Sequence, residues 1–295
     1  MSRLRRRSKL FTPGNRPQMF PKAVATDADM IVLDLEDAVG EEGKGAARQA
    51  VRTALESLDF GAKEVGVRIN GVDTPHWLED LQTVFCARLD AIHLPKVRSP
   101  REVWAVEAVL SALEARQGRT RPVVIIPTLE SAEAIENARA IATCSPRVAA
   151  LQFGLGDLKW ELGLIPAPHR LAWFRTQVVL AARAAGIPAL DTVFFDFRDA
   201  EGYRRDAEEA RACGFRGKSC IHPSQVPIAN QVFSPTPEEV AEAREILKAY
   251  QAALARGQGT VGLHGRMVDK PVADAAREVL IWAGECGSEE DGTGE

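Results

Sequence analysis

Eight short runs of apolar, β-forming residues recur along the chain, and segments of helical composition separate them. Several runs, such as 30–33 and 123–126, are continuously apolar, as parallel strands are when helices cover both faces of their sheet. Eight strand–helix repeats favour an α/β fold, the closed (β/α)8 or TIM barrel; an open doubly wound sheet is the alternative. The predicted strands cover residues 8–12, 30–35, 64–69, 91–94, 123–129, 149–153, 187–193 and 217–221. The predicted helices cover residues 44–58, 74–87, 101–116, 131–143, 169–185, 200–213, 238–255 and 271–282.

The length of 295 residues accommodates one such barrel and a C-terminal extension. We expect the barrel to be the catalytic domain and to cover residues 7–235. C-terminal helices that form a lid are expected over 236–284, with a hinge at 258–262. The tail 285–295 consists mainly of Gly, Ser, Glu and Asp and is expected to be disordered.

Charge and cysteine usage exclude several classes of partner. The formal net charge is −4, and no apolar stretch approaches the roughly 20 residues that span a bilayer, so we expect neither a nucleic-acid partner nor a membrane partner. The basic run Arg3, Arg5, Arg6, Arg7 and Lys9 is interpreted as a solvated arm. Five scattered cysteines without a CxxC pair argue against a disulfide framework and against zinc, and they suit a reducing cytoplasm.

Reactive side chains follow the C-terminal end of nearly every predicted strand. In a barrel these ends meet at one rim, where the active sites of this fold are built. A functional site is therefore expected at that rim. Its candidate residues, in strand order, are Asp34, Glu36 and Asp37, then Arg68, Lys96, Glu130, Asp157, Asp191 and His222.

Carboxylates outnumber cations among these candidates, and oxygen ligands of this kind select a hard cation such as Mg²⁺. Glu130 and Asp157 end neighbouring strands and are the predicted metal ligands. The alternative is that both form structural salt bridges with Arg68 and Lys96. Gly154 precedes Asp157 without forming a GxGxxG motif, and we expect it to allow close approach of the backbone to a ligand.

Two of the rim residues allow more than one interpretation. His222 could be a general base or a structural histidine, and the sequence does not separate these. Lys96 could form a Schiff base, as in class I aldolases, but the surrounding carboxylates favour an ion-pair role.

The chain resembles the citrate lyase beta-subunit-like family, which includes malyl-CoA and citramalyl-CoA lyases. The resemblance runs from about Arg7 to Ala283, nearly the whole chain, and consists of seven motifs in the same order. These motifs are Leu10-Phe11-Thr12-Pro13-Gly14-Asn15-Arg16-Pro17, Leu33-Asp34-Leu35-Glu36-Asp37-Ala38-Val39, Val67-Arg68-Ile69-Asn70, Leu94-Pro95-Lys96-Val97, Phe153-Gly154-Leu155-Gly156-Asp157-Leu158, Ile221-His222-Pro223-Ser224-Gln225 and Gly265-Arg266-Met267-Val268-Asp269.

The resemblance implies a Mg²⁺-dependent carbon–carbon lyase. Its substrate would be a 3-hydroxyacyl-CoA, namely malyl-, citramalyl- or citryl-CoA, and its products acetyl-CoA and an oxo acid. Glu130 and Asp157 match the family's Mg²⁺ ligands, and Glu130 also borders the substrate. Arg68 matches the arginine that contacts the substrate and its thioester oxygen. Around these residues, Glu36, Asp37 and Lys96 are expected to orient Arg68 or metal-bound waters.

The resemblance also implies roles for residues outside the rim. Phe11, Arg16 and Lys22 match positions near CoA, where the two cations would face its phosphates. Asp269 matches an aspartate on a C-terminal lid that enters the site of a neighbouring subunit, which implies a homotrimer or a hexamer. From the residues alone, Asp269 reads as the N-cap of the last helix.

Two departures from the family pattern bear on substrate preference. Gly156 stands where many members carry an acidic residue before the metal-binding aspartate. His264 replaces an acid, and Lys270 follows Asp269, so the charge of the lid is altered.

Three other functions remain open at this point. One is a Mg²⁺-dependent aldolase that acts on free hydroxy-oxo acids, for which Arg16 and Lys22 would have no phosphate to bind. Another is the beta subunit of a multi-protein citrate lyase that acts on an acyl-carrier thioester. The last is a binding protein that retains the barrel, which the set Arg68, Glu130 and Asp157 disfavours.

Overall fold

The computed structural model describes residues 5–164 and 168–285. Arg3 and residues 286–295 lie outside the described residues, so of the tail 285–295 that was predicted to be disordered only Glu285 is described. The chain divides into two compact units, and each is considered by itself. One unit is Arg6–Phe233, and the other contains Arg5 and the described residues from Ser234 onwards.

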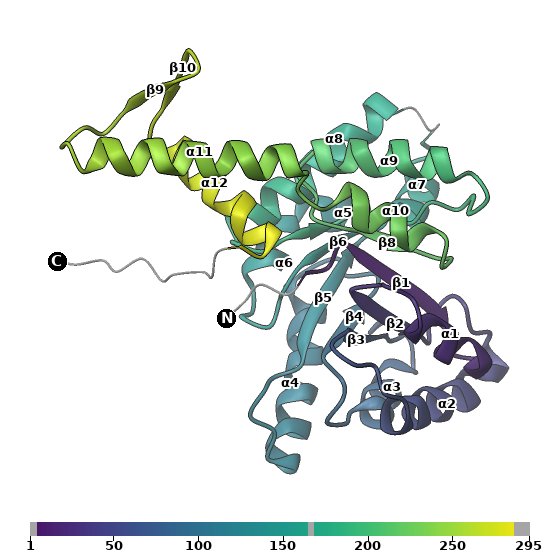
Figure 1. The fold of residues 1–295 in the computed structure, drawn as a ribbon. Helices are drawn as coiled ribbons and strands as arrows, with labels where there is room; N and C mark the ends of the chain where they lie inside the picture. The colour runs from purple at the N-terminus through teal and green to yellow at the C-terminus, as the bar shows by residue number, and fades with distance from the viewer. Residues whose placement is uncertain (1–4, 165–167, 286–295) are drawn as a thin grey trace. The chain divides into compact units, whose positions relative to one another are not determined.

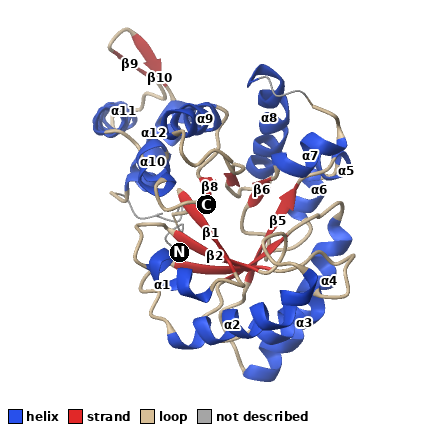
Figure 2. Ribbon diagram, turned by 90° about the vertical axis from the view of Figure 1, so that its right-hand side faces the viewer, coloured by secondary structure: helices blue, strands red, loops and turns tan. Residues whose placement is uncertain are grey.

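Eight parallel strands form the centre of the unit Arg6–Phe233, and helices surround them (Figures 1 and 2). Their spatial order is β7-β6-β5-β4-β3-β2-β1-β8, and a parallel bridge between Asp191 and Lys218 links β7 to β8. The predicted (β/α)8 barrel is therefore confirmed. Its strands are β1 (Ser8–Pro13), β2 (Met30–Asp34), β3 (Glu64–Arg68), β4 (Ala91–Leu94), β5 (Val124–Leu129), β6 (Leu151–Phe153), β7 (Ala189–Leu190) and β8 (Lys218–Cys220).

Local sequence signals set both ends of α4, the longest helix of this unit. In α4, Ser99 and Glu102 form a capping box, and Gly118 ends the helix in the left-handed conformation. The segment 131–143, predicted as one helix, is two helices that meet at Asn137 (φ −89°, ψ 4°). The helices are α1 (Phe20–Val24), α2 (Lys44–Ser57), α3 (Trp77–Val84), α4 (Pro100–Gln117), α5 (Ala132–Glu136), α6 (Ala138–Thr143), α7 (Leu155–Glu161), α8 (Pro168–Ala184), α9 (Ala200–Ala212) and α10 (Gln225–Val232), with 3-10 turns η1 (Pro17–Met19) and η2 (Glu41–Gly43).

Side chains alternate along each strand between the inside of the barrel and the helix layer. In β2, Met30 and Val32 belong to a small interior cluster, whereas Ile31 and Leu33 belong to the large core beneath the helices. Asp34 lies two residues after Val32 in β2, so its side chain also points toward the inside of the barrel. The same alternation decides, for each polar residue near a strand end, whether its side chain lies at the rim or in the helix layer.

The prediction that the basic N-terminal run is a solvated arm is wrong for Arg6, Arg7 and Lys9. Arg6 is buried and forms two hydrogen bonds with the carboxylate of Glu64, at 2.6 and 2.7 Å. Arg7 pairs with Asp29. Lys9 is fully buried inside the barrel, where its ammonium group donates to Gln152, and burial together with the charges of Arg68 and Arg6 lowers its pKa.

Asp191 was expected at the rim, and this expectation is also wrong. Leu190 points into the barrel, so the next residue, Asp191, points into the helix layer. There the fully buried carboxylate pairs with Arg175 of α8, at 3.0 Å, and with Lys218 of β8. Asp191 therefore holds helices to the barrel wall.

The C-terminal unit is built on two helices, α11 (Pro237–Leu254) and α12 (Lys270–Ala283), which pack together through Val240, Ala243, Ala276 and Leu280. A two-stranded hairpin, β9 (Val261–Leu263) and β10 (Arg266–Val268), joins them. Its turn residues His264 and Gly265 have φ of 48° and 75°, the conformation that a type I′ turn requires. The predicted hinge at 258–262 thus overlaps the first strand of a hairpin.

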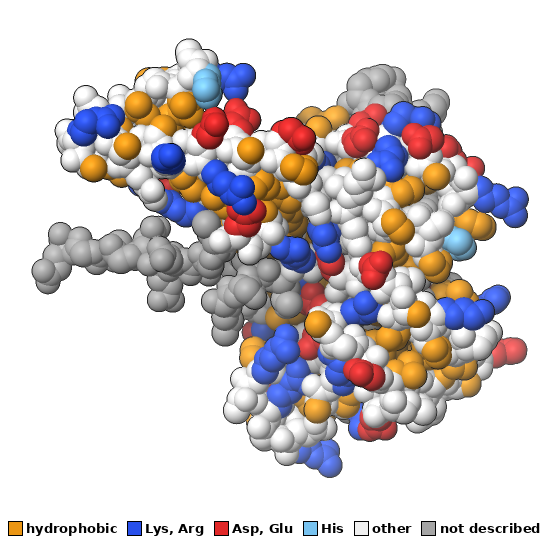
Figure 3. All heavy atoms as spheres, viewed as in Figure 1, with side chains coloured by type: hydrophobic (Ala, Val, Ile, Leu, Met, Phe, Trp, Pro, Cys, Tyr) orange, Lys and Arg blue, Asp and Glu red, His pale blue; other side chains and the backbone are white. Residues whose placement is uncertain are grey.

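Acidic and basic side chains are interspersed on the face drawn in Figure 3, without a large area of one sign. Among the described residues, no helix is both long enough and apolar enough to cross a bilayer.

Candidate active site

A pocket of about 390 Å³ opens at the C-terminal ends of the barrel strands. Residues within β1, β2, β3, β5, β6 and β8, and residues that follow β2 and β5 to β8, line it. It brings together Phe11, Arg68, Glu130 and Asp157, which the sequence had placed in one site. Asp34 and Asp37 line it as well.

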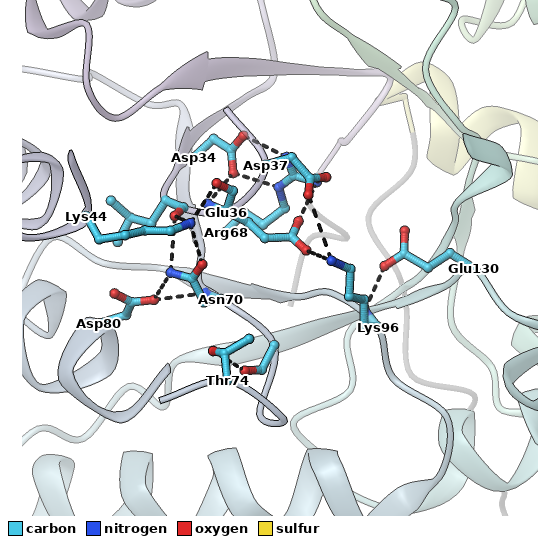
Figure 4. A network of polar contacts seen from close by, with 12 residues as sticks. Asp34, Glu36, Asp37, Lys44, Arg68, Asn70, Thr74, Asp80, Lys96 and Glu130 are labelled. Carbon is cyan, nitrogen blue, oxygen red and sulfur yellow. Dashed lines mark hydrogen bonds and ion pairs between the residues drawn. The ribbon is translucent and has the colours of Figure 1, made fainter. Parts of the chain in front are cut away.

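Arg68, at the end of β3, is held by carboxylates from the end of β2 (Figure 4). Its Nε and Nη2 donate to the two oxygens of Asp34, at 2.7 and 2.6 Å, and its Nη1 lies 2.8 Å from Glu36 Oε2. Burial acts to lower the pKa of Arg68, but these carboxylates outweigh it and raise the pKa. The guanidinium is therefore a fixed cation, held by Asp34, Glu36 and Asp37, in a residue that lines the pocket.

A buried lysine fixes the backbone that carries Asp34 and Glu36. The ammonium group of Lys44, on α2, donates to the carbonyl oxygens of Leu35 and Glu36, both at 2.9 Å, and to Asn70 Oδ1 at 2.6 Å. Asn70 in turn donates to Asp80. Sequence reasoning missed this support, because nothing in the pattern around Lys44 separates it from a solvated helix lysine.

Lys96 contributes both its side chain and its backbone. Its Nζ lies 3.1 Å from Glu36 Oε1, so Glu36 sits between Arg68 and Lys96. Its φ of 53° is unusual for a residue with a side chain, and the backbone N–H donates to Glu130 Oε1 at 2.6 Å. The strained backbone thus orients the carboxylate of Glu130.

Gly154 makes room for Glu130. A Cβ atom at Gly154 would lie 2.6 Å from Glu130 Cβ and 2.7 Å from Glu130 Oε2. The next residue, Leu155, donates its backbone N–H to Thr192 Oγ1 at 3.1 Å, which ties the start of α7 to the end of β7. Asp157 follows in the first turn of α7 and is exposed to the pocket.

Replacing Gly154 with alanine is therefore expected to displace the Glu130 carboxylate and to weaken Mg²⁺ binding by about tenfold or more. Titration calorimetry with Mg²⁺ measures the effect. Gly45→Ala is the matched control, because a Cβ at Gly45 on α2 meets no atom within 4 Å. Equal Mg²⁺ affinity in both variants would contradict the steric argument.

The electrostatics at Glu130 fit a divalent cation. Burial, with the nearby charges of Glu36 and Asp157, raises the pKa of Glu130 to about 7. Burial likewise raises the pKa of Glu36 to about 7, and its two buried oxygens receive no directed hydrogen bond despite the neighbouring cations. Crowded carboxylates of this kind are stabilised by a cation with oxygen preference.

The salt-bridge alternative for the metal pair does not match the described contacts. Within residues 5–164 and 168–285, the side chains of Arg68 and Lys96 pair with Asp34, Glu36 and Asp37, and no ion pair involves Glu130 or Asp157. No group of three or more His, Cys, Asp or Glu suited to a metal occurs among the described residues. Two carboxylates match the usual protein share of a Mg²⁺ shell, which waters and ligand oxygens complete.

The remaining predicted residues occupy different surroundings. Phe11 lines the pocket, and its ring centre lies 5.2 Å from Arg68 Cζ. Arg16 and Lys22 are exposed just after β1, and neither forms an ion pair with another described residue. His222 is exposed, stacks on Phe197, and its Nδ1 lies 2.8 Å from Ser224 Oγ.

Asp269 lies in the C-terminal unit and caps α12, because its Oδ1 accepts the backbone N–H of Val272 at 3.2 Å. The N-cap interpretation is therefore confirmed. Capping occupies one carboxylate oxygen and leaves the other available for chemistry.

Comparison with known proteins places these observations in context. The model of the HpcH/HpaI aldolase/citrate lyase family matches residues 7–223, and a model described as a C–C bond lyase of the TIM-barrel fold matches residues 171–283.

Individual relatives match over most of their length. An L-malyl-CoA/beta-methylmalyl-CoA lyase of Cereibacter sphaeroides is 40% identical over 285 residues, which cover 89% of this chain and 90% of the relative. The citrate lyase subunit beta of Leuconostoc mesenteroides subsp. cremoris is 37% identical over 93% of this chain and 92% of its own. The crystal structure of CitE from Mycobacterium tuberculosis, in complex with magnesium, acetoacetate and coenzyme A, superposes with a TM-score of 0.75 at 34% identity and covers 94% of this chain and 98% of that one.

Proposed function

Because the chain belongs to the HpcH/HpaI aldolase/citrate lyase family, we propose that it interconverts a 3-hydroxyacyl-CoA with acetyl-CoA and an oxo acid. It is a carbon–carbon lyase that acts on CoA thioesters, and Mg²⁺ is its cofactor. Malyl-, citramalyl- and citryl-CoA are the candidate substrates. The observation that carries the proposal is a single pocket in which a fixed arginine accompanies two carboxylates of neighbouring strands.

Glu130 and Asp157 are the residues that would hold Mg²⁺. The bound ion supplies positive charge that polarises the carboxylate and hydroxyl oxygens of the substrate. Lys96 keeps Glu130 oriented through its backbone N–H, and Gly154 leaves the space that Glu130 occupies.

Arg68 is suited to the thioester end of the reaction. Cleavage separates the acetyl unit from the hydroxyl-bearing carbon of the substrate. It leaves negative charge on the thioester oxygen of acetyl-CoA as its enolate forms. A guanidinium already fixed by Asp34 can stabilise that charge without reorganising. Glu36 and Asp37 maintain its position from the other side.

The CoA moiety would extend from the pocket past the end of β1. Phe11 lies at the pocket wall, and exposed Arg16 and Lys22 offer positive charge to the CoA phosphates. An aldolase that acts on free hydroxy-oxo acids would have no use for these two cations.

Asp269 is proposed to move the proton at the enolate carbon, from a lid that enters the site of a neighbouring subunit. We propose a homotrimer or a hexamer for this arrangement. A cytoplasmic location is proposed because the four described cysteines are all free thiols.

Replacing Asp269 with asparagine separates its two roles. Asparagine caps a helix as well as aspartate does, so α12 should persist, but it cannot transfer a proton. We expect solvent exchange of the acetyl-CoA methyl protons, followed by NMR with Mg²⁺ and an oxo acid present, to fall by at least about 100-fold. If the rate of methyl-proton exchange is unchanged, Asp269 serves only as the N-cap of α12.

A panel of CoA thioesters, assayed with the purified chain with and without Mg²⁺, tests the proposal as a whole. Mg²⁺-dependent release of acetyl-CoA from at least one of malyl-, citramalyl- and citryl-CoA is expected. Cleavage of free hydroxy-oxo acids alone would favour the aldolase instead. Activity only after addition of an acyl-carrier thioester would make the chain a citrate lyase subunit.

A further inference from the structure

One side of the pocket is apolar. Val193 and Phe195 follow β7, Ile221 follows β8, and all three line the pocket. Phe195 lies over the loop that carries Asp157, since a Cβ at Gly156 would be 3.7 Å from Phe195 Cζ. The apolar wall is therefore adjacent to the proposed metal position.

The backbone around Phe195 is anchored, although the residue as a whole is 70% exposed. The carbonyl of Phe194 accepts a hydrogen bond from Gln225 at 3.0 Å, and the Phe194 ring packs edge-on against Tyr203. Asp199 caps α9 by accepting the N–H of Gly202. A large aromatic ring on an anchored backbone, with most of its surface uncovered at a pocket, is suited to contact a ligand.

Charge restricts what that ligand can carry. Among the described residues that line the pocket, Arg68 is the only Lys, Arg or His, and three carboxylates already surround it. Four pocket residues are acidic: Asp34, Asp37, Glu130 and Asp157. One ligand carboxylate can be neutralised at the metal, but the pocket lining of this chain offers a second one only these acids or the apolar wall.

We propose that the oxo acid partner carries one carboxylate and a small apolar substituent, and that Phe195 sets the size limit of that substituent. This inference rests on the proposed function and narrows it. A hydrogen or a methyl group, as in glyoxylate or pyruvate, fits against Val193, Phe195 and Ile221. The second carboxylate of oxaloacetate does not, so citryl-CoA is a poor substrate by comparison.

The test follows condensation of acetyl-CoA with four oxo acids, using the full chain with Mg²⁺ and chromatographic detection of the new CoA ester. Wild type is expected to use glyoxylate or pyruvate at least about tenfold better than oxaloacetate, in kcat/KM. Phe195→Ala should raise the kcat/KM for 2-oxobutyrate relative to that for pyruvate by about tenfold. One methylene group changes kcat/KM by about that factor in an apolar pocket. Phe195→Leu, a milder change, should raise this ratio by a smaller factor.

Phe197→Ala is the matched control, since Phe197 lies on the same loop but stacks on His222 and does not line the pocket. Its 2-oxobutyrate to pyruvate ratio should equal that of wild type. Efficient use of oxaloacetate by wild type, or equal ratios in the Phe195 and Phe197 variants, would overturn the inference while leaving the lyase assignment intact. Failure to condense any of the four acids would instead overturn the proposed function.

Discussion

Glu130→Gln is expected to lower Mg²⁺-dependent turnover by at least about 1000-fold, which corresponds to about 4 kcal/mol of transition-state stabilisation. Glutamine keeps the shape of the side chain and can still accept the N–H of Lys96, so the variant removes charge and little else. Without that charge, Asp157 alone cannot provide the two carboxylates proposed to bind the ion. Glu130→Ala should remove Mg²⁺ dependence completely.

Two measurements check this prediction together: turnover against Mg²⁺ concentration, and Mg²⁺ affinity by calorimetry. Glu133→Ala serves as the control, because Glu133 is exposed in the first turn of α5, close in sequence to Glu130. The prediction is wrong if Glu130→Gln retains turnover within about threefold of wild type at the same Mg²⁺ concentration.

Arg68→Lys is expected to lower kcat by about 100- to 1000-fold while Mg²⁺ affinity stays within a few-fold of wild type. A lysine keeps the positive charge, but one ammonium group cannot satisfy both oxygens of Asp34 and also face the thioester oxygen. The variant should therefore lose far more in kcat than in Mg²⁺ affinity.

The lysine variant is preferable to Arg68→Ala, which should also collapse turnover but has a second effect. Alanine would leave the buried carboxylates of Asp34 and Glu36 without their main cation, which costs roughly 3 to 5 kcal/mol of stability. Thermal unfolding should report that loss. Arg52→Lys, within α2, is the control for replacing an arginine with a lysine. Near-normal kcat in Arg68→Lys would exclude the proposed role of Arg68 in enolate stabilisation.

All eight barrel strands were predictable because short β-forming runs alternate regularly with segments of helical composition. The short helices α1, α7 and α10 were not, since five to eight residues give too little periodicity to distinguish them from loops. The break at Asn137 also escaped prediction, because asparagine within an otherwise apolar repeat is compatible with a continuous helix.

The site was predictable to the extent that it depends on strand ends. The strand-end pattern placed Arg68, Glu130 and Asp157 together, and they line one pocket. Asp191 was misplaced because its neighbour Leu190 takes the inward position. Arg6 and Lys9 are buried against Glu64 and Gln152, which lie more than 50 residues away in the sequence. The run of basic residues alone therefore wrongly predicted that they are exposed to solvent. The N–H that Lys96 directs at Glu130 is a backbone property that side-chain chemistry does not reveal.

The position of β1 has a consequence for how the chain folds during synthesis. β1 pairs with β2 on one side and with β8 on the other, yet the residues of β8 leave the ribosome about 200 residues after those of β1. Until then one edge of β1 is unpaired, and Lys9 has no complete interior to occupy. Translation must therefore pass Cys220 before the first strand acquires its last neighbour, and nascent chains arrested earlier should be vulnerable to proteases and to association with one another.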